Sequence, residues 1–189
     1  IASTADELAT KTLGIVGLGK IGLNIARLAK AFGMRVVGTK RTFVPHLPNV
    51  DELYPADQLS RVLAVSDYLV LVVPLTPNTR ALIGPEEIAL MKDGARLINV
   101  ARGAMLDHHA LDEALRSGKL GGAALDVLPE EPLPPESPIW QMPNVIITPH
   151  TAGSHSRYGE SAAAIFKTNL DGFLSGGEMV NVYSRELGY

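Results

Sequence analysis

The chain contains no cysteine, so it has neither a disulfide framework nor a thiolate that could serve as a nucleophile or a metal ligand. This absence is consistent with a reducing compartment. The chain also lacks an apolar run of the roughly 18 residues that a membrane-spanning helix needs, and its start carries no recognisable secretory signal. We therefore expect a cytoplasmic protein without a membrane segment.

Positive charge is scarce as well. Seventeen Lys and Arg residues against 20 Asp and Glu residues leave a net charge of −3, and the basic residues form no tract apart from one short turn. A nucleic-acid partner is therefore not expected. The 189 residues, 46% hydrophobic and 20% charged, suit a globular domain with a sizeable core. Because the chain begins at Ile1 rather than Met, we expect a processed or partial chain.

The most informative segment is a glycine triplet with the spacing G-x-G-x-x-G, formed by Gly17, Gly19 and Gly22. An apolar run, residues 12–16, enters the triplet, and an amphipathic run, residues 23–32, leaves it. In this strand–turn–helix context the first glycine permits a tight turn, the second admits a pyrophosphate, and the third packs helix on strand. The segment predicts a dinucleotide site, and a plain structural turn is the alternative.

Apolar strands alternate with helices along the rest of the chain. This alternation predicts a parallel sheet covered by helices on both faces, a Rossmann-like doubly wound α/β fold that occupies residues 1–189 as one NAD(P)-binding domain. Asp107 is the expected N-cap of one helix, and Gly118 follows its end. We expect strands over residues 12–16, 34–38, 68–73, 95–100, 120–127 and 144–148, and helices over 23–32, 57–65, 85–91, 107–117 and 156–175.

The end of the second predicted strand bears on which dinucleotide is bound. An NAD site usually has an acidic residue about 20 residues after the glycines, to hold the ribose 2′-OH. This chain has Thr39-Lys40-Arg41-Thr42 there and no acid. Two cations would attract a 2′-phosphate, so we predict NADP(H), with NAD(H) and a merely solvated basic turn as the alternatives.

In a parallel sheet, ligands lie beyond the carboxyl ends of the strands. Such ends carry Arg102, Asp126, the pair Glu130-Glu131, and His150. An arginine can hold a carboxylate bidentately, an imidazolium can donate a proton to a carbonyl oxygen, and a carboxylate can stabilise that imidazolium. The set suits hydride chemistry on a small keto acid, although each residue alone could also be a surface ion pair, an acidic loop or a turn cap.

The order of the motifs resembles the cofactor-binding domain of the D-isomer-specific 2-hydroxyacid dehydrogenase family. The resemblance implies that Arg102 binds the substrate carboxylate and carbonyl, that His150 is the acid/base, and that Glu131 is its partner, with Glu130 as the alternative. It also implies that Asp126 lies near the nicotinamide. The motifs that carry it are 17–22, 74–80, 91–95, Ile98-Asn99-Val100-Ala101-Arg102-Gly103, 124–127, Glu131-Pro132 and Thr148-Pro149-His150.

The expected cofactor contacts follow from the glycine turn, the basic turn and the strand ends. The candidate cofactor-binding residues are Gly17, Gly19, Lys20, Ile21, Gly22, Lys40, Arg41, Thr42, Pro74, Thr79, Val100, Ala101, Asp126, His150 and Gly153. No metal site is expected: His108 and His109 are adjacent and lack the i, i+4 spacing of a metal-binding pair, so we expect both to be solvated.

Two departures from the family pattern matter. Lys40 stands where the family often carries an acid, so the chain resembles its NADP-dependent glyoxylate and hydroxypyruvate reductase members. Family members are also longer, so we expect that the substrate-binding domain, formed mostly by residues before the cofactor domain, lies outside this chain. We expect this chain alone to bind cofactor and to reduce keto acids poorly. By analogy with the family, we expect a homodimer. The alternatives are a non-enzymatic dinucleotide sensor, or a formate or phosphite dehydrogenase of the same family.

Overall fold

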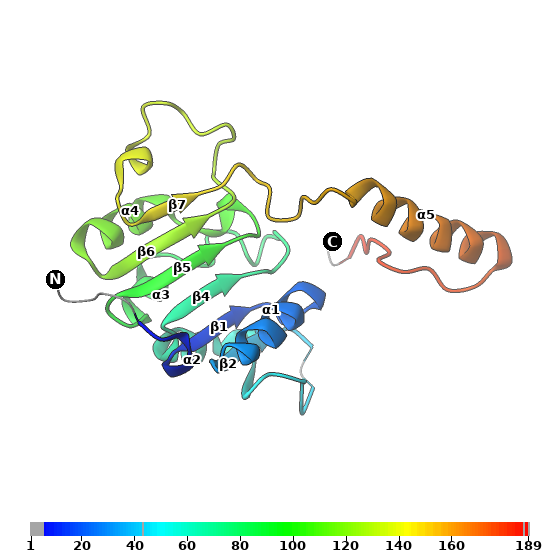
Figure 1. Cartoon of the computed structure of the whole chain (residues 1–189), viewed down its shortest axis with the longest axis horizontal. Helices are drawn as coiled ribbons and strands as arrows, with labels where there is room; N and C mark the ends of the chain where they lie inside the picture. The colour runs from blue at the N-terminus through cyan, green and yellow to red at the C-terminus, as the bar shows by residue number, and fades with distance from the viewer. Residues whose placement is uncertain (1–5, 43, 187, 189) are drawn as a thin grey trace. The chain divides into compact units, whose positions relative to one another are not determined.

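The computed structural model describes residues 6–42, 44–186 and 188, which belong to two compact units, Ile1–Pro149 and His150–Tyr189. Within the described residues, the first unit contains a seven-stranded parallel sheet with the order β3-β2-β1-β4-β5-β6-β7 (Figure 1). The strands are β1 (Thr12–Val16), β2 (Arg35–Lys40), β3 (Glu52–Pro55), β4 (Tyr68–Leu71), β5 (Ala95–Asn99), β6 (Leu120–Leu125) and β7 (Val145–Ile147).

Side chains alternate between the two faces of a strand, and this alternation divides the core in two. Ile15 of β1 packs with Ala26 and Ala29 of helix α1 (Lys20–Ala31). The neighbouring Val16 belongs to the other cluster, which holds the buried side chains of α2 (Leu59–Val65), α3 (Pro85–Leu90) and α4 (His108–Ser117). Helices therefore cover both faces, and the predicted doubly wound α/β fold is confirmed.

Most predicted elements are present with shifted ends. The strand predicted over 34–38 runs from Arg35 to Lys40, and the strands predicted over 68–73 and 120–127 stop at Leu71 and Leu125. Four short 3₁₀ helices complete the described elements: Leu8–Thr10, Ala56–Gln58, Gly103–Met105 and Pro138–Gln141. Strand β3 was not predicted. It is a half-buried edge strand of sequence Glu-Leu-Tyr-Pro, and it lacks the apolar run that marks the central strands.

The predicted caps of the helix after Arg102 are confirmed. The Asp107 carboxylate accepts the backbone N–H groups of His109 and Ala110, each at 3.0 Å, and Gly118 ends α4 with φ 79°. Both ends of α4 are therefore set by local sequence, which fixes where its first residue, His108, meets the preceding turn.

The strand order places the ends of β1, β4, β5, β6 and β7 along one edge of the sheet (Figure 1). The chain runs outward from β1 in one direction through β2 and β3, and in the other through β4 to β7. The order thus reverses between β1 and β4, and open sheets of this kind bind ligands beyond the carboxyl ends of the strands at such a reversal.

The second unit contains helix α5 (Tyr158–Ser175), which ends at Gly176 with φ 70°. The Asn169 side chain binds the returning chain through both polar groups, with Nδ2 donating to the Val180 carbonyl at 3.0 Å and Oδ1 accepting the Val180 N–H at 2.7 Å. None of the described residues of α5 is buried, and Phe166, Phe173 and Leu174 are each about 70% exposed.

Among the residues that the structure describes, no helix is both long enough and apolar enough to span a membrane.

Candidate active site at the carboxyl edge of the sheet

The glycine turn joins β1 to α1, and its three glycines meet different surroundings. Gly17 has φ 106°, and a Cβ there would lie 2.6 Å from Val73 Cγ1. A Cβ at Gly22 would lie 2.2 Å from the Gly17 carbonyl oxygen. A Cβ at Gly19 would meet no atom of the described chain within 4 Å, so the protein itself does not require glycine there. This is the pattern expected if Gly19 is small to admit a ligand at the helix N-terminus, and it fits a pyrophosphate.

The end of β2 lies against this turn. The Leu18 N–H donates to the Thr39 carbonyl at 2.9 Å, and Lys40 Nζ donates to the Leu18 carbonyl at 3.0 Å. Lys40 is half-buried, whereas Arg41 and Thr42 are exposed. The basic turn is therefore attached to the glycine turn through Lys40, which a freely solvated loop would not require.

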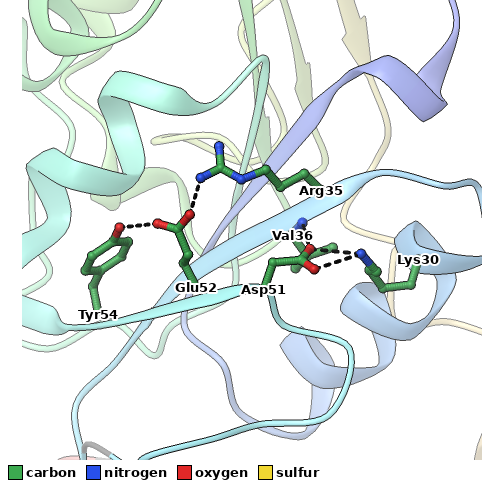
Figure 2. A network of polar contacts seen from close by, with 6 residues as sticks. All are labelled: Lys30, Arg35, Val36, Asp51, Glu52 and Tyr54. Atoms are coloured by element: carbon green, nitrogen blue, oxygen red, sulfur yellow. Dashed lines mark hydrogen bonds and ion pairs between the residues drawn. The ribbon is translucent and has the colours of Figure 1, made fainter.

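Asp51 and Glu52 are the first acids after this turn in the sequence. Figure 2 shows that Asp51 points toward Lys30 and Glu52 toward Arg35. Asp51 accepts the Val36 N–H at 2.7 Å and pairs with Lys30 at 2.9 Å, while Glu52 accepts from Arg35 and from the Tyr54 hydroxyl. These contacts lie at the amino-terminal ends of β2 and β3.

The same contacts lower the pKa of both acids. Burial raises the pKa of Asp51, but the Val36 N–H and the Lys30 ammonium outweigh it, so the net pKa is lowered. The Tyr54 hydroxyl and then Arg35 lower the pKa of Glu52. Both carboxylates lie beside the start of β2, whereas Lys40 is its last residue.

A buried asparagine shapes the turn that carries Arg102. Asn99, the last residue of β5, accepts the Ala101 N–H through Oδ1 at 3.0 Å and donates from Nδ2 to the Arg102 carbonyl at 2.9 Å. The Arg102 side chain is exposed, and its Nη1 donates to the Ala101 carbonyl at 2.6 Å. The Arg102 backbone is therefore held by the Asn99 side chain, while the guanidinium stays on the surface.

The loop that carries Glu131 is in contact with this turn. A Cβ at Gly103 would lie 2.1 Å from the carbonyl carbon and oxygen of Leu128, so the two backbones touch. The Leu128 N–H donates in turn to Glu131 Oε1 at 3.0 Å. The structure thereby brings together the segments of Arg102 and Glu131, as the sequence predicted from their strand ends.

The neighbouring strand ends carry the other predicted residues of the first unit. Asp126 is buried, its N–H donates to the Asn99 carbonyl at 3.0 Å, and its Oδ1 accepts the Thr148 hydroxyl at 2.6 Å. Beyond β4, the Thr79 hydroxyl donates to the Pro74 carbonyl at 2.7 Å and accepts the Thr76 N–H. Thr79 therefore closes its own loop, and Asp126 ties the ends of β5, β6 and β7 together.

His150 and Gly153 lie in the second unit, which begins at His150. His150 comes three residues after β7 and has φ 54°. Its predicted role beside Arg102 and Glu131 stays a prediction, as does the prediction that residues 1–189 form one NAD(P)-binding domain.

The prediction that both histidines of α4 are solvated is wrong for His108. Its ring nitrogen Nε2 lies 3.0 Å from the Gly103 carbonyl oxygen, whereas the His109 side chain is 84% exposed, as predicted. Asn99 and His108 are thus the residues near the site whose roles sequence reasoning missed. The signal for Asn99 is an asparagine at the end of a predicted strand, because an asparagine side chain can bond its own backbone two residues further on. The signal for His108 is the helical period: it lies three and seven residues before the buried Leu111 and Leu115, whereas His109 lies three, four and seven residues before charged residues.

Comparison with known proteins decides the family. The model of the NAD-binding domain of the D-isomer specific 2-hydroxyacid dehydrogenases matches residues 2–152. The chain belongs to this family. The family assignment made from the motifs is confirmed, and the chain carries the NAD-binding domain of an oxidoreductase family.

Curated members of the family include close relatives. D-3-phosphoglycerate dehydrogenase of Methanocaldococcus jannaschii is 42% identical over 180 residues, which are 93% of this chain and 33% of that protein. Glyoxylate reductase of Aeropyrum pernix is 40% identical over 183 residues, 96% of this chain and 54% of that protein. This chain therefore spans between a third and about half of the length of these dehydrogenases.

Solved structures of the family share the fold. A D-isomer specific 2-hydroxyacid dehydrogenase from Xanthobacter autotrophicus, in complex with NADPH and MES, matches with a TM-score of 0.91 at 37% identity, over 99% of this chain and 76% of that one. The NADPH-dependent glyoxylate/hydroxypyruvate reductase from Sinorhizobium meliloti, in complex with NADP and sulfate, matches with a TM-score of 0.91 at 35% identity, over 99% of this chain and 60% of that one.

Proposed function

We propose that the enzyme containing this chain transfers a hydride from NADPH to a short 2-keto acid of the glyoxylate or hydroxypyruvate type, giving the D-2-hydroxy acid. The observation that carries the proposal is the contact between the Arg102 turn and the Glu131 loop, beyond the same sheet edge as the glycine turn. Arg102 would then supply a cation for the substrate carboxylate, and Glu131 an anion for the imidazolium, beside the nicotinamide of a bound cofactor.

The preference for NADPH is proposed from the end of β2. Lys40 is held at the Leu18 carbonyl, Arg41 follows it, and the next acids in the chain are bound at the other end of the strand. A ribose 2′-phosphate would gain charge-assisted hydrogen bonds there, whereas a ribose 2′-OH would have neither Asp51 nor Glu52 to accept from it. Two structural relatives were solved with NADPH or NADP, which supports the same assignment.

The substrate class is proposed from Arg102 and from the named reductases among the relatives. A guanidinium on a rigid turn can bind a carboxylate bidentately and polarise the adjacent carbonyl. When bound, the cofactor supplies the hydride. His150 would hold the proton for the carbonyl oxygen, and Glu131 would stabilise the charged imidazole. A dinucleotide sensor would need neither proton donor nor carboxylate anchor, so that alternative is not favoured.

We also propose that the enzyme is a cytoplasmic homodimer whose substrate-binding domain lies outside this chain. The chain alone would then bind cofactor but turn over keto acids poorly, because half of the cleft that orients substrate and excludes water is missing. Light scattering on the full-length enzyme tests the dimer.

A substrate and cofactor panel tests the proposed activity. The full-length enzyme is assayed with glyoxylate, hydroxypyruvate, pyruvate and 3-phosphohydroxypyruvate, each with NADPH and with NADH. We expect the highest kcat/KM for glyoxylate or hydroxypyruvate with NADPH. A higher value with NADH, or with 3-phosphohydroxypyruvate, would contradict the cofactor or the substrate assignment, respectively.

A further inference from the structure

His108, the first residue of α4, faces the turn that follows Arg102. Its Nε2 lies 3.0 Å from the Gly103 carbonyl oxygen, which also accepts the Leu106 N–H at 3.1 Å. Its Nδ1 is buried and has no hydrogen-bond partner among the described residues. One ring nitrogen is thus bonded to the active-site turn, and the other is enclosed without a partner.

These contacts define the form of the ring. A carbonyl oxygen can only accept a hydrogen bond, so Nε2 must carry the hydrogen. Protonating Nδ1 as well would bury an N–H with nothing to accept it, which is unfavourable. Burial lowers the pKa of His108, and the Gly103 carbonyl and the nearby Asp107 carboxylate only partly oppose this. His108 is therefore a neutral donor to Gly103.

Gly103 links the two halves of the proposed site. It follows Arg102 directly, and its α-carbon packs against the backbone of Leu128, whose N–H donates to Glu131. Asn99 holds the Arg102 carbonyl from the strand side, and His108 holds the Gly103 carbonyl from the helix side. The backbone that carries the guanidinium is thus anchored at two successive carbonyls.

We propose that His108 is a positioning residue, which acts through Gly103 to aim the Arg102 guanidinium at the carboxylate of the keto acid. This inference rests on the proposed function. His108 contacts the backbone that carries Arg102 and is not placed against the reacting atoms, so its effect is on the position of the Arg102 side chain. A misplacement of about 1 Å at such a group can cost about 100-fold in rate.

The test compares two adjacent histidines of the same helix in the full-length enzyme. His108→Leu removes the donor and places an apolar side chain there. His108→Gln restores an N–H donor near the position of Nε2, and His109→Leu and His109→Gln are the matched exposed controls. The steady-state constants for glyoxylate, the Kd for NADPH and the Tm are measured for each variant.

We expect His108→Leu to lower kcat/KM for glyoxylate by about tenfold, a smaller loss than a full misplacement of about 1 Å would cause, with the NADPH Kd unchanged within about twofold. His108→Gln should recover most of that loss, and both His109 variants should match the wild type. A purely structural role would lower the Tm of His108→Leu and leave the glyoxylate constants unchanged. That result, or equal losses in His108→Gln and His108→Leu, would overturn the inference.

A second measurement does not depend on activity. A long-range ¹H–¹⁵N NMR spectrum of this 189-residue chain reports the tautomer of each of its 5 histidines, and His108→Gln identifies the signal that belongs to His108. We expect hydrogen on Nε2 only, and hydrogen on Nδ1 would overturn the inference.

The two proposals fail in different ways. If wild-type enzyme reduces no keto acid, the proposed function fails and takes the positioning role with it, whatever the tautomer. If wild-type enzyme is active but His108→Leu equals it, only the inference about His108 fails.

Discussion

The two ends of strand β5 each carry an arginine, and the two arginines have different surroundings. Arg96, the second residue of β5, lies with its guanidinium 5.4 Å from the centre of the Tyr68 ring at the amino edge of the sheet. Arg102, beyond the carboxyl end, sits on a turn braced by Asn99, and no carboxylate in the described part of the chain pairs with it. The first packs on a neighbouring strand, and the second is presented outward.

The same contrast extends to the rest of both edges. At the amino edge, charges pair with one another: Lys30 with Asp51 and Lys92 with Asp67, each at 2.9 Å. At the carboxyl edge, polar side chains such as Asn99 and Thr79 bind backbone and shape turns. One edge therefore pairs its charges with one another, and the other uses polar side chains to hold the backbone of its loops in place.

Replacing each of the two arginines by alanine gives the largest expected difference between the edges. Arg102→Ala in the full-length enzyme should lower kcat/KM for glyoxylate by at least about 100-fold, because the carboxylate anchor is lost, and should leave the NADPH Kd nearly unchanged. Arg96→Ala, at the other end of the same strand, should change neither by more than about twofold. Similar losses in both variants would contradict the division between the edges.

The charge at the end of β2 should decide the cofactor. Lys40→Asp should raise the NADPH Kd by about 10- to 100-fold and lower the NADH Kd, since a carboxylate repels the 2′-phosphate and accepts from the 2′-OH. Lys30→Gln, which removes a cation bound to Asp51 at the amino edge, serves as the control. Fluorescence titration of both cofactors measures the change, and an unaltered preference in Lys40→Asp would exclude Lys40 from the phosphate site.

The glycine turn allows ligand and protein requirements to be separated. Gly19→Ala should weaken NADPH binding by about tenfold with little change in Tm, because its Cβ would meet open space at φ −89°. Gly22→Ala should instead destabilise the fold by about 1–3 kcal/mol, since its Cβ would meet the Gly17 carbonyl oxygen. Titration and thermal unfolding of the two variants distinguish these effects. Unchanged NADPH affinity in Gly19→Ala would mean that no ligand lies over this residue.

The amino edge should affect stability alone, and its effect should vanish in acid. Asp67 accepts the Thr12 N–H at 2.8 Å and pairs with Lys92; burial raises its pKa, but these two partners outweigh burial and bring it below the ordinary 3.8. A lowered folded pKa stabilises the protein above the unfolded value, and this contribution is lost as pH falls through the folded value.

Asp67→Asn should therefore destabilise the chain by about 1–2 kcal/mol at pH 7, and the difference from wild type should shrink below about pH 4. Urea unfolding at several pH values measures this, with the NADPH Kd at pH 7 expected to be unchanged. A difference that grows in acid would show that the sign is wrong.

Sequence reasoning was most successful where the signal is local. The run into Gly17, the cap at Asp107 and the αL glycine at 118 each depend on residues within one turn of the chain, and the structure has all of them. It failed at β3, whose four half-buried residues form a strand because Val37 to Lys40 lie beside them. Pairing with a neighbour, rather than intrinsic preference, makes that strand.

The sequence by itself determined the alternation of strands and helices, the glycine turn and the family, because periodicity, turn chemistry and ordered motifs are properties of short segments. Only the tertiary structure decided that Lys40 binds the glycine turn, that the Arg102 and Glu131 loops touch, and that His108 bonds the Gly103 carbonyl. Those contacts join segments from different strands and turns, and burial at such meeting points depends on how the whole sheet places them.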